Sequence, residues 1–286
     1  EDLEILPELT SFQVNPNDFE KVKGKKSKSG GFGIVTFMIN KKTQQKVVQK
    51  RTKVTLRDDD IRNSFIREIQ ILAAYRHIAI VPFVGFSIRG ETGYVYLRAM
   101  ESGSLLDVIH KFRNGINNPL WDFTHKLIIS YGVAAAMAFL HRNQVIHRDL
   151  RPDNILLDKN YYPYITDFGT AKNGTSQMCQ TIAETTTYIM APEFIEDPAN
   201  YSISYPIDVF SFGMTLYHMF TGMYPFETLR SKMLIINAVI NNKRPEIPDY
   251  VPQPIQSIIT ACWSQDPNSS PPFQEALDLL QCPEMY

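Results

Sequence analysis

The sequence has 286 residues, of which 44% are hydrophobic and 21% are charged, and its formal net charge is −1. This composition is typical of a globular protein, and the balanced charge excludes a whole-molecule field that would attract nucleic acid or an anionic membrane. Three widely separated cysteines predict neither a disulfide framework nor a metal site. They favour a reducing compartment, so we expect a cytoplasmic location.

The first part of the chain is rich in β-prone runs that are separated by polar turns. Residues 1–16 are expected to form a tail that either packs on the body or is disordered. The expected elements that follow are a hairpin of Phe32–Ile39 and Lys46–Arg51, a helix over Asp58–Tyr75, and a hairpin of Pro82–Ile88 and Tyr94–Ala99.

Beyond about residue 100 the hydrophobic pattern is mostly helical. Strands first and helices later predict an α+β fold, in which a small antiparallel sheet lobe over residues 17–98 joins a larger helical lobe over residues 99–286. The longest apolar run, Leu127–Leu140, is short and interrupted by polar groups, so no bilayer-spanning segment is expected. The first residue is Glu1 rather than Met, which is compatible with a fragment of a longer protein. The expected helices are Trp121–Arg142, Tyr205–Thr221, Arg230–Asn241, Pro254–Ala261 and Pro272–Leu280.

The most informative motif is the segment from His147 to Asn154, which is followed by Asp167-Phe168-Gly169. Phosphoryl transfer needs two negatively charged species held in line, cations that mask their charge, and an acceptor for the hydroxyl proton. Asp149 could accept that proton. Asn154 and Asp167 offer the hard oxygen ligands that Mg²⁺ prefers.

In this order and at this spacing, the two motifs resemble the catalytic loop and the metal-binding turn of protein kinases. The resemblance extends from about residue 19 to 280, and the segment Cys262–Pro267 is similar to the tyrosine-kinase-like group of Ser/Thr kinases. It implies a two-lobed kinase fold that binds ATP and Mg²⁺ between the lobes and phosphorylates a protein substrate. Arg151 stands where Ser/Thr kinases usually carry lysine, so Tyr or dual specificity stays open.

Several segments of the first lobe extend this resemblance. Residues 30–35 resemble the second half of the glycine-rich loop that covers phosphates, although Lys28 replaces its first glycine. Lys50 matches the phosphate-binding lysine, but taken alone it could be an exposed strand residue, and its neighbours Arg51 and Lys53 compete for the assignment. Glu68 lies in the apolar stripe of its helix, where a carboxylate is costly unless it is paired. We expect Glu68 to pair with Lys50; the alternative is a pair with a surface arginine.

The resemblance implies a role for each matching position. Leu97 would close the back of the adenine pocket, and the backbone of Arg98 and of Met100 would meet the adenine edge. The catalytic residues would be Asp149, Lys50, Glu68, Arg151 and Asn154. The nucleotide-binding residues would be Gly30, Gly31, Phe32, Gly33, Val35, Val48, Lys50, Leu97, Arg98, Met100, Leu156 and Asp167. The metal ligands would be Asn154 and Asp167.

The segment from Thr170 to Met190 resembles an activation segment that ends in Ala191-Pro192-Glu193. Phosphorylation could order it through Arg148, and the candidate hydroxyls are those of Thr175, Ser176, Thr181, Thr185, Thr186 and Thr187. One departure from the family is clear, because Ser270 stands where an arginine usually pairs with Glu193. Glu193 therefore needs another partner, a wetter site or a looser segment.

Two other readings compete with an active kinase. A pseudokinase, which binds nucleotide or a partner without useful turnover, is favoured by Lys28, Val48 and Ser270 but opposed by the retained lysine, glutamate and catalytic-loop residues. Five lysines between Lys21 and Lys28 could bind nucleic acid, but no aromatic residue interleaves with them, so a solvated strand end is favoured. The substrate and the oligomeric state are not predicted.

Overall fold

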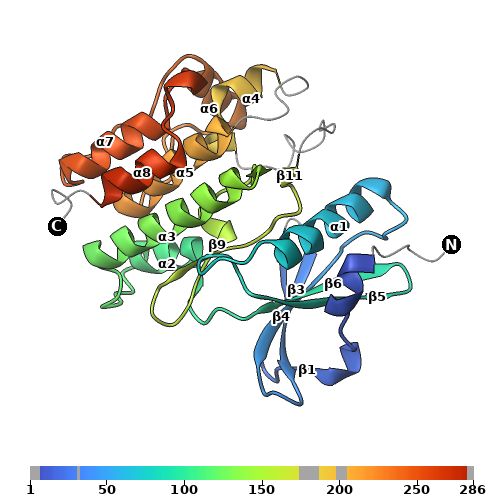
Figure 1. Ribbon diagram of the computed structural model, residues 1–286. Helices are drawn as coiled ribbons and strands as arrows, with labels where there is room; N and C mark the ends of the chain where they lie inside the picture. Colours follow the sequence, from blue (N-terminus) through green and yellow to red (C-terminus); the bar gives the residue numbers. More distant parts are fainter. Residues whose placement is uncertain (1–6, 31–32, 174–186, 198–204, 282–286) are drawn as a thin grey trace. The chain divides into compact units, whose positions relative to one another are not determined.

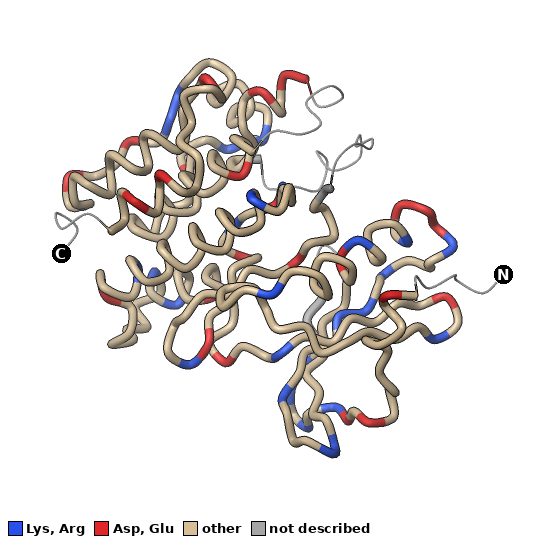
Figure 2. Tube along the Cα trace, in the orientation of Figure 1, with Lys and Arg blue, Asp and Glu red and all other residues tan. Residues whose placement is uncertain are grey.

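The computed structural model describes residues 7–30, 33–173, 187–197 and 205–281 (Figure 1). They form two compact units. Unit 1 contains the chain up to Met100 together with Asp167–Thr170, and unit 2 contains Glu101–Thr166 and the chain from Ala171 onward. Acidic and basic residues are interspersed over each unit, in keeping with the balanced net charge (Figure 2).

Unit 1 is built on an antiparallel sheet in the order β1-β3-β4-β6-β5, with β2 paired to β3 (Figure 1). The two predicted hairpins are confirmed as β3–β4 and β5–β6. The short strands β1 and β2 were not predicted. The strands are β1 Phe19–Lys21, β2 Lys28–Gly30, β3 Gly33–Asn40, β4 Lys46–Arg51, β5 Phe83–Arg89 and β6 Thr92–Arg98.

Helix α1 spans Asp59–Ala74, in agreement with the prediction. It begins where the side chain of Asp58 accepts a 3.0 Å hydrogen bond from the backbone N–H of Ile61. Acidic residues gather in its first turn, where the helix dipole favours negative charge (Figure 2). The buried stripe of α1 contains Phe65, Ile69, Leu72 and also Glu68. The fold therefore places a carboxylate in an apolar interior.

The described part of the N-terminal tail packs on unit 1. It consists of two 3-10 helices, Pro7–Phe12 and Pro16–Asp18. Leu9 is buried, and the backbone N–H of Val14 donates to the carbonyl of Phe86 in β5 at 2.9 Å. Gly85 has a φ of 155°, and a Cβ there would lie 2.5 Å from the carbonyl oxygen of Phe12, so only glycine admits this close approach.

Unit 2 is mainly helical, and its core surrounds α5, in which every residue from Ile207 to Phe220 is buried. The small strands form two sheets, β10-β9-β7 and β11-β8. Its helices are α2 Leu105–Arg113, α3 Phe123–Arg142, α4 Pro192–Glu196, α5 Pro206–Thr221, α6 Lys232–Ile240, α7 Gln253–Cys262 and α8 Phe273–Leu280. Its strands are β7 Gly103–Ser104, β8 Val145–Ile146, β9 Ile155–Leu157, β10 Pro163–Ile165 and β11 Lys172–Asn173.

Helix α3 is longer than the apolar run that the sequence suggested. With 20 residues, it is by length and composition the one helix among the described residues that could cross a membrane. Half of its most apolar stretch is buried, however, and the helix packs against α8 and β10 within unit 2. These contacts are those of a core helix.

Candidate active site

In unit 1 the side chain of Lys50 lies between two carboxylates. Its Nζ is 2.9 Å and 3.1 Å from the two oxygens of Glu68, and 2.8 Å from Oδ1 of Asp167. Strand β4 provides the lysine and helix α1 provides the glutamate. The side chains of Lys50 and Glu68 are only 14% and 6% exposed, so water screens this pair weakly. The predicted pairing of Lys50 with Glu68 is present in the structure.

The electrostatics of this cluster keep Lys50 charged. Burial alone would lower the pKa of the Lys50 ammonium, but the carboxylates of Asp167 and Glu68 outweigh it and raise the pKa above its ordinary value. The cluster therefore holds a permanent cation at a fixed position.

The register of the sheet decides which side chains share a face with Lys50. Val35 is directly opposite Lys50, and Val48 is opposite Leu97. Because successive side chains of a strand alternate between faces, these four lie on the same face of the sheet. Arg51 is on the other face and exposed, so it does not take the place of Lys50. Strand geometry thus separates Arg51 from Lys50, whereas Lys53 lies beyond the end of β4.

The glycine-rich segment is described only in part. Gly30 pairs with Gly33, and a Cβ at Gly33 would lie 2.4 Å from the carbonyl oxygen of Arg51, so a side chain is excluded there. Gly31 and Phe32 lie outside the described residues. At the end of β6 and just beyond it, Leu97 and Met100 are buried and Arg98 is exposed.

Asp167 belongs to unit 1 because its neighbours bind α1. The hydroxyl of Ser64 donates to the carbonyl oxygen of Gly169 at 2.8 Å, and Arg67 approaches the same oxygen at 3.5 Å. Asp167 itself has a φ of 68°, in the left-handed region. Sequence reasoning missed Ser64, although it lies one helical turn before Glu68 and thus on the same face of α1.

In unit 2 the amide of Asn154 orients Asp149. Its Nδ2 donates to both the backbone oxygen and Oδ2 of Asp149, each at 2.8 Å. Both residues are buried, with exposures of 3% for Asp149 and 7% for Asn154. Because these bonds use the amide nitrogen, the carbonyl oxygen of Asn154 is left for a cation.

Asp208 of α5 binds the backbone of the loop that leads to Asp149. Its carboxylate accepts hydrogen bonds from the backbone N–H groups of Arg148 at 2.7 Å and His147 at 2.8 Å, and from Nε2 of His141 at 2.9 Å. Burial would raise the pKa of Asp208, but the bond from His141 and the proximity of His147 lower it. Asp208 therefore binds the loop backbone, and does so as a carboxylate.

Two further residues of the predicted site, Arg151 and Leu156, lie in unit 2. Arg151 forms an ion pair with Asp153 at 2.8 Å, and Leu156 is a half-buried residue of β9. His147 is fully buried, and its ring contacts the backbone at the carbonyl of Thr166 and the N–H of Asp149. His147 thus has a structural position.

Each of the two predicted metal ligands offers a hard oxygen atom, Asp167 in unit 1 and Asn154 in unit 2. Among the described residues, no group of three or more His, Cys, Asp and Glu side chains is arranged to hold a metal ion. Asp167 and Asn154 would supply one carboxylate and one amide oxygen. Mg²⁺ commonly binds through one or two protein ligands, with water and phosphate oxygens completing its shell.

Arg244 is a cation whose charge acts on Glu193, the residue that lacks an arginine at position 270. Burial raises the pKa of the half-buried Glu193, and the charge of Arg244 opposes this shift. Arg244 donates to the carbonyl of Trp263 at 2.8 Å and lies 5.1 Å from the centre of the Phe210 ring. Of the three alternatives predicted for Glu193, the charge of Arg244 favours another partner, but the pKa of Glu193 stays raised.

The end of the predicted activation segment is described. Thr187–Ile189 forms a 3-10 helix, and the hydroxyl of Ser211 in α5 donates to the carbonyl of Ile189 at 2.8 Å. The other candidate phosphorylation sites lie outside the described residues, and these are Thr175, Ser176, Thr181, Thr185 and Thr186.

A buried histidine that sequence reasoning missed lies in the same unit. His218 of α5 has no exposed surface, and in the described chain neither of its ring nitrogens has a hydrogen-bond partner. Its ring centre is 4.4 Å from that of Tyr224 and 6.4 Å from that of Tyr188. Burial, followed by the charges of His110 and Arg113, lowers the pKa of His218 to about 4.

Comparison with known proteins gives a consistent result. Serine/threonine-protein kinase STY17 of Arabidopsis thaliana is 31% identical over 237 residues, which are 82% of this chain and 40% of that protein. Dual specificity protein kinase pyk3 of Dictyostelium discoideum is 33% identical over 79% of this chain and 16% of its own length. Serine/threonine-protein kinase TNNI3K of Rattus norvegicus is 29% identical over 96% of this chain and 32% of its own length.

The chain thus spans two fifths or less of these relatives. The protein kinase domain family matches residues 23–279, which include every group described above from Lys50 to Asp208. Since this match covers nearly the whole chain, the protein belongs to the protein kinase family.

Proposed function

We propose that this kinase transfers the γ-phosphoryl group of ATP to Ser or Thr hydroxyls of protein substrates. The observation that carries the proposal is the contact of Lys50 with both Glu68 and Asp167. A buried cation braced by a helix carboxylate is what phosphate binding requires. Burying a charged pair costs free energy, so the fold would keep this lysine charged and buried for a role that uses its charge.

In unit 1, Lys50 would bind the α- and β-phosphates of ATP. Its ammonium has three N–H groups, and the contacts with Glu68 hold the side chain in one orientation, so less entropy is lost when phosphate binds. Val35, Val48 and Leu97 share the face of Lys50 and would provide the apolar surface for adenine.

In unit 2, Asp149 would orient the substrate hydroxyl and accept its proton. Asn154 fixes one carboxylate oxygen of Asp149, and Asp208 fixes the backbone on which it stands. Asn154 in this unit would supply an amide oxygen to Mg²⁺, and Asp167 in unit 1 would supply a carboxylate oxygen; the role of Mg²⁺ would be to neutralise phosphate charge during transfer. Arg151, held by Asp153, would add positive charge near the transferred group.

The preference for Ser and Thr is supported by the relatives, two of which are named serine/threonine-protein kinases. One relative of similar identity is named a dual specificity protein kinase. The proposal therefore predicts mainly phosphoserine and phosphothreonine in the product, and phosphoamino-acid analysis distinguishes this from a product rich in phosphotyrosine.

The deciding experiment is transfer of labelled phosphate from ATP to a generic protein substrate by the wild type and Asp149→Asn. General-base groups contribute about 10²–10⁴-fold to rate, so Asp149→Asn should lose at least about a hundredfold. Asp249→Asn makes the same chemical change at an exposed loop position and should retain activity. Equal background signal from the wild type and Asp149→Asn would instead identify a binding module without turnover.

A further inference from the structure

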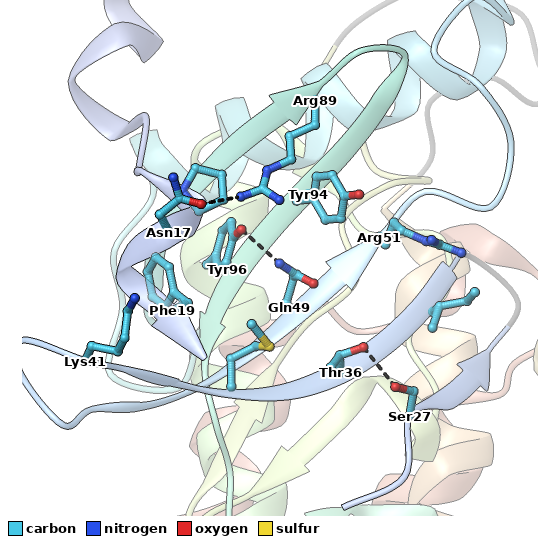
Figure 3. Close-up of a pocket in the computed structure, with 13 residues that line it drawn as sticks. Asn17, Phe19, Ser27, Thr36, Lys41, Gln49, Arg51, Arg89, Tyr94 and Tyr96 are labelled. Atoms are coloured by element: carbon cyan, nitrogen blue, oxygen red, sulfur yellow. Dashed lines mark hydrogen bonds between the residues drawn. The ribbon is translucent and has the colours of Figure 1, made fainter. Parts of the chain in front are cut away.

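Unit 1 contains a polar pocket on the face of the sheet opposite Lys50. Its volume is about 690 Å³, and its floor includes Thr36 of β3, Gln49 of β4 and Tyr96 of β6, which are directly paired across the three strands (Figure 3). Each of these positions is one residue away from the phosphate-binding face. Strand alternation therefore separates this pocket from the proposed nucleotide site.

One wall of the pocket comes from the N-terminal segment. Pro16, Asn17 and Phe19 line it, and the ring of Phe19 stacks on that of Tyr96 with centres 4.5 Å apart. The match to the protein kinase family begins only at residue 23. This wall is thus added by a part of the chain that the family match does not include.

The charged side chains in the described lining are all positive. Lys41, Arg51 and Arg89 lie on three sides of the lining (Figure 3), which contains no Asp or Glu among the described residues. Within the described residues, none of these three cations forms an ion pair. Lys42, by contrast, is neutralised by Asp18 at 2.9 Å. An incoming anion would therefore not have to displace a protein carboxylate.

Neutral polar groups are held in place between the cations. Nη2 of Arg89 donates to Oδ1 of Asn17 at 3.2 Å, which orients the guanidinium and leaves its other N–H groups available. Nε2 of Gln49 donates to the hydroxyl of Tyr96 at 2.9 Å. The hydroxyls of Ser27 and Thr36 are 3.0 Å apart. The lining therefore offers amide and hydroxyl groups that suit a ligand rich in hydroxyls.

Polar groups outweigh apolar surface in this pocket. Tyr96 is fully buried and Phe19 is 7% exposed, so their rings mainly cover each other, whereas Ile34, Met38 and Tyr94 are half-buried parts of the lining. Cations at three sides with hydroxyl and amide groups between them match a compact molecule that carries several phosphates on a polyol.

We infer that this pocket binds a soluble polyol phosphate, and that it does so independently of the nucleotide. The probe is myo-inositol hexakisphosphate, titrated calorimetrically into the full chain in the presence of saturating ATP. The variants are Arg51→Gln, Arg89→Gln and their combination. Both arginines are exposed, so neither substitution should disturb folding. Lys46→Gln is the matched control, because Lys46 is an exposed cation of β4 on the opposite face.

The expected result is saturable binding with ATP present. Each arginine variant should bind about tenfold more weakly, since a charge-assisted hydrogen bond contributes about 1.5–3 kcal/mol. The double variant should be weaker still, whereas Lys46→Gln should match the wild type. Phosphotransfer by the variants should be retained, which separates failure here from failure of the proposed function.

Other outcomes would overturn the inference. Loss of binding on addition of ATP would place the probe in the nucleotide site. Equal weakening by Lys46→Gln would indicate attraction by general positive charge. Binding of polyglutamate as tight as that of the polyol phosphate would point to an acidic protein partner. Binding only to vesicles that contain phosphatidylinositol bisphosphate would assign the site to a lipid surface.

Discussion

The carboxylate of Asp208 holds Arg148 in a backbone conformation that arginine rarely adopts. Arg148 has a φ of 70°, and its N–H donates to Oδ1 of Asp208 at 2.7 Å. A non-glycine residue in the left-handed region costs about 1–2 kcal/mol. The charged hydrogen bond, at about 1.5–3 kcal/mol, is sufficient to offset that cost. The next residue is Asp149, so the backbone conformation of Arg148 sets the direction in which the chain enters the proposed catalytic base.

Asp208→Asn should therefore destabilise the fold and reduce phosphotransfer. An amide has one acceptor oxygen, so at least one of the two backbone N–H groups loses its partner, at a cost of about 1–3 kcal/mol. Urea denaturation at neutral pH measures the loss. The exposed substitution Asp249→Asn serves as the control, and equal stability of the two variants would contradict the proposed anchor.

The stability lost in Asp208→Asn should depend on pH. The pKa of Asp208 is lowered in the folded state, so its contribution to stability is present above the pKa of the unfolded chain and disappears as pH falls through the folded-state pKa. Asp208→Asn should lose stability mainly above the unfolded pKa, and the difference from the wild type should shrink in acid. A difference that is constant with pH would mean that the lost interaction is not that of a carboxylate.

Glu68→Gln tests the brace on Lys50. The amide cannot carry the charge that fixes the ammonium, and Asp167 becomes the remaining anion at Lys50 in the described cluster. We expect the KM for ATP to rise by about tenfold, which corresponds to about 1.4 kcal/mol of lost binding. Steady-state kinetics at varied ATP concentration measure this change.

A matched control for Glu68→Gln is Glu91→Gln in the same unit. Glu91 forms an ion pair with Arg57, but the two side chains are 46% and 79% exposed. Exposed pairs contribute about 0–1 kcal/mol, so Glu91→Gln should leave the KM for ATP unchanged. If both variants raised the KM equally, a general effect of charge would replace the specific role of Glu68.

The long elements of the fold could be predicted from sequence because their periodicity extends over several turns or alternations. The hairpin β3–β4 and the helices α1 and α5 illustrate this, since each has capping or turn residues at the expected ends. The strands β7, β8 and β11 have two residues each and carry no periodic signal. Helix α4 is also short, with five residues, and only its Pro192 marks a helix start.

The candidate site was predictable where a motif fixes residue types, but not where distant segments meet. The pairing of Lys50 with Glu68 follows from a costly carboxylate on an apolar helix face. The hydrogen bond from Ser64 to Gly169 joins segments 105 residues apart, and no local sequence pattern predicts it. The polar pocket around Gln49 was missed because alternate strand residues that look like a solvated face become a cavity only when the N-terminal segment covers them.

His218 should make the fold sensitive to acid. Its pKa falls from 6.5 to about 4 on folding, so the unfolded chain binds the proton more readily between these values. Stability is therefore retained above pH 6.5 and lost as pH falls toward 4, by about 3 kcal/mol. The positive charges of His110 and Arg113 act in the same direction as burial, and Glu227 opposes them.

His218→Phe should remove this part of the acid sensitivity. Phenylalanine fits among the rings of Tyr188 and Tyr224 and carries no buried N–H that lacks a partner. Denaturant unfolding at neutral and at mildly acidic pH compares the wild type, His218→Phe and the control His125→Gln. The control should keep the acid sensitivity of the wild type. An undiminished acid loss in His218→Phe would assign the effect to other groups.

Gly169→Ala should weaken the attachment of Asp167 to α1, and a second substitution should partly restore it. A Cβ at Gly169 would lie 2.8 Å from the hydroxyl oxygen of Ser64, which is too close for the present geometry. The turn must then shift, and with it the carboxylate that contacts Lys50. Ser64→Ala removes the clashing atom but also the 2.8 Å hydrogen bond, so alone it should reduce activity modestly. In the double variant the methyl group fits, and activity should exceed that of Gly169→Ala. A coupling of about 0.5–3 kcal/mol from kcat/KM for ATP supports direct contact, whereas additive losses would show that the two residues act separately.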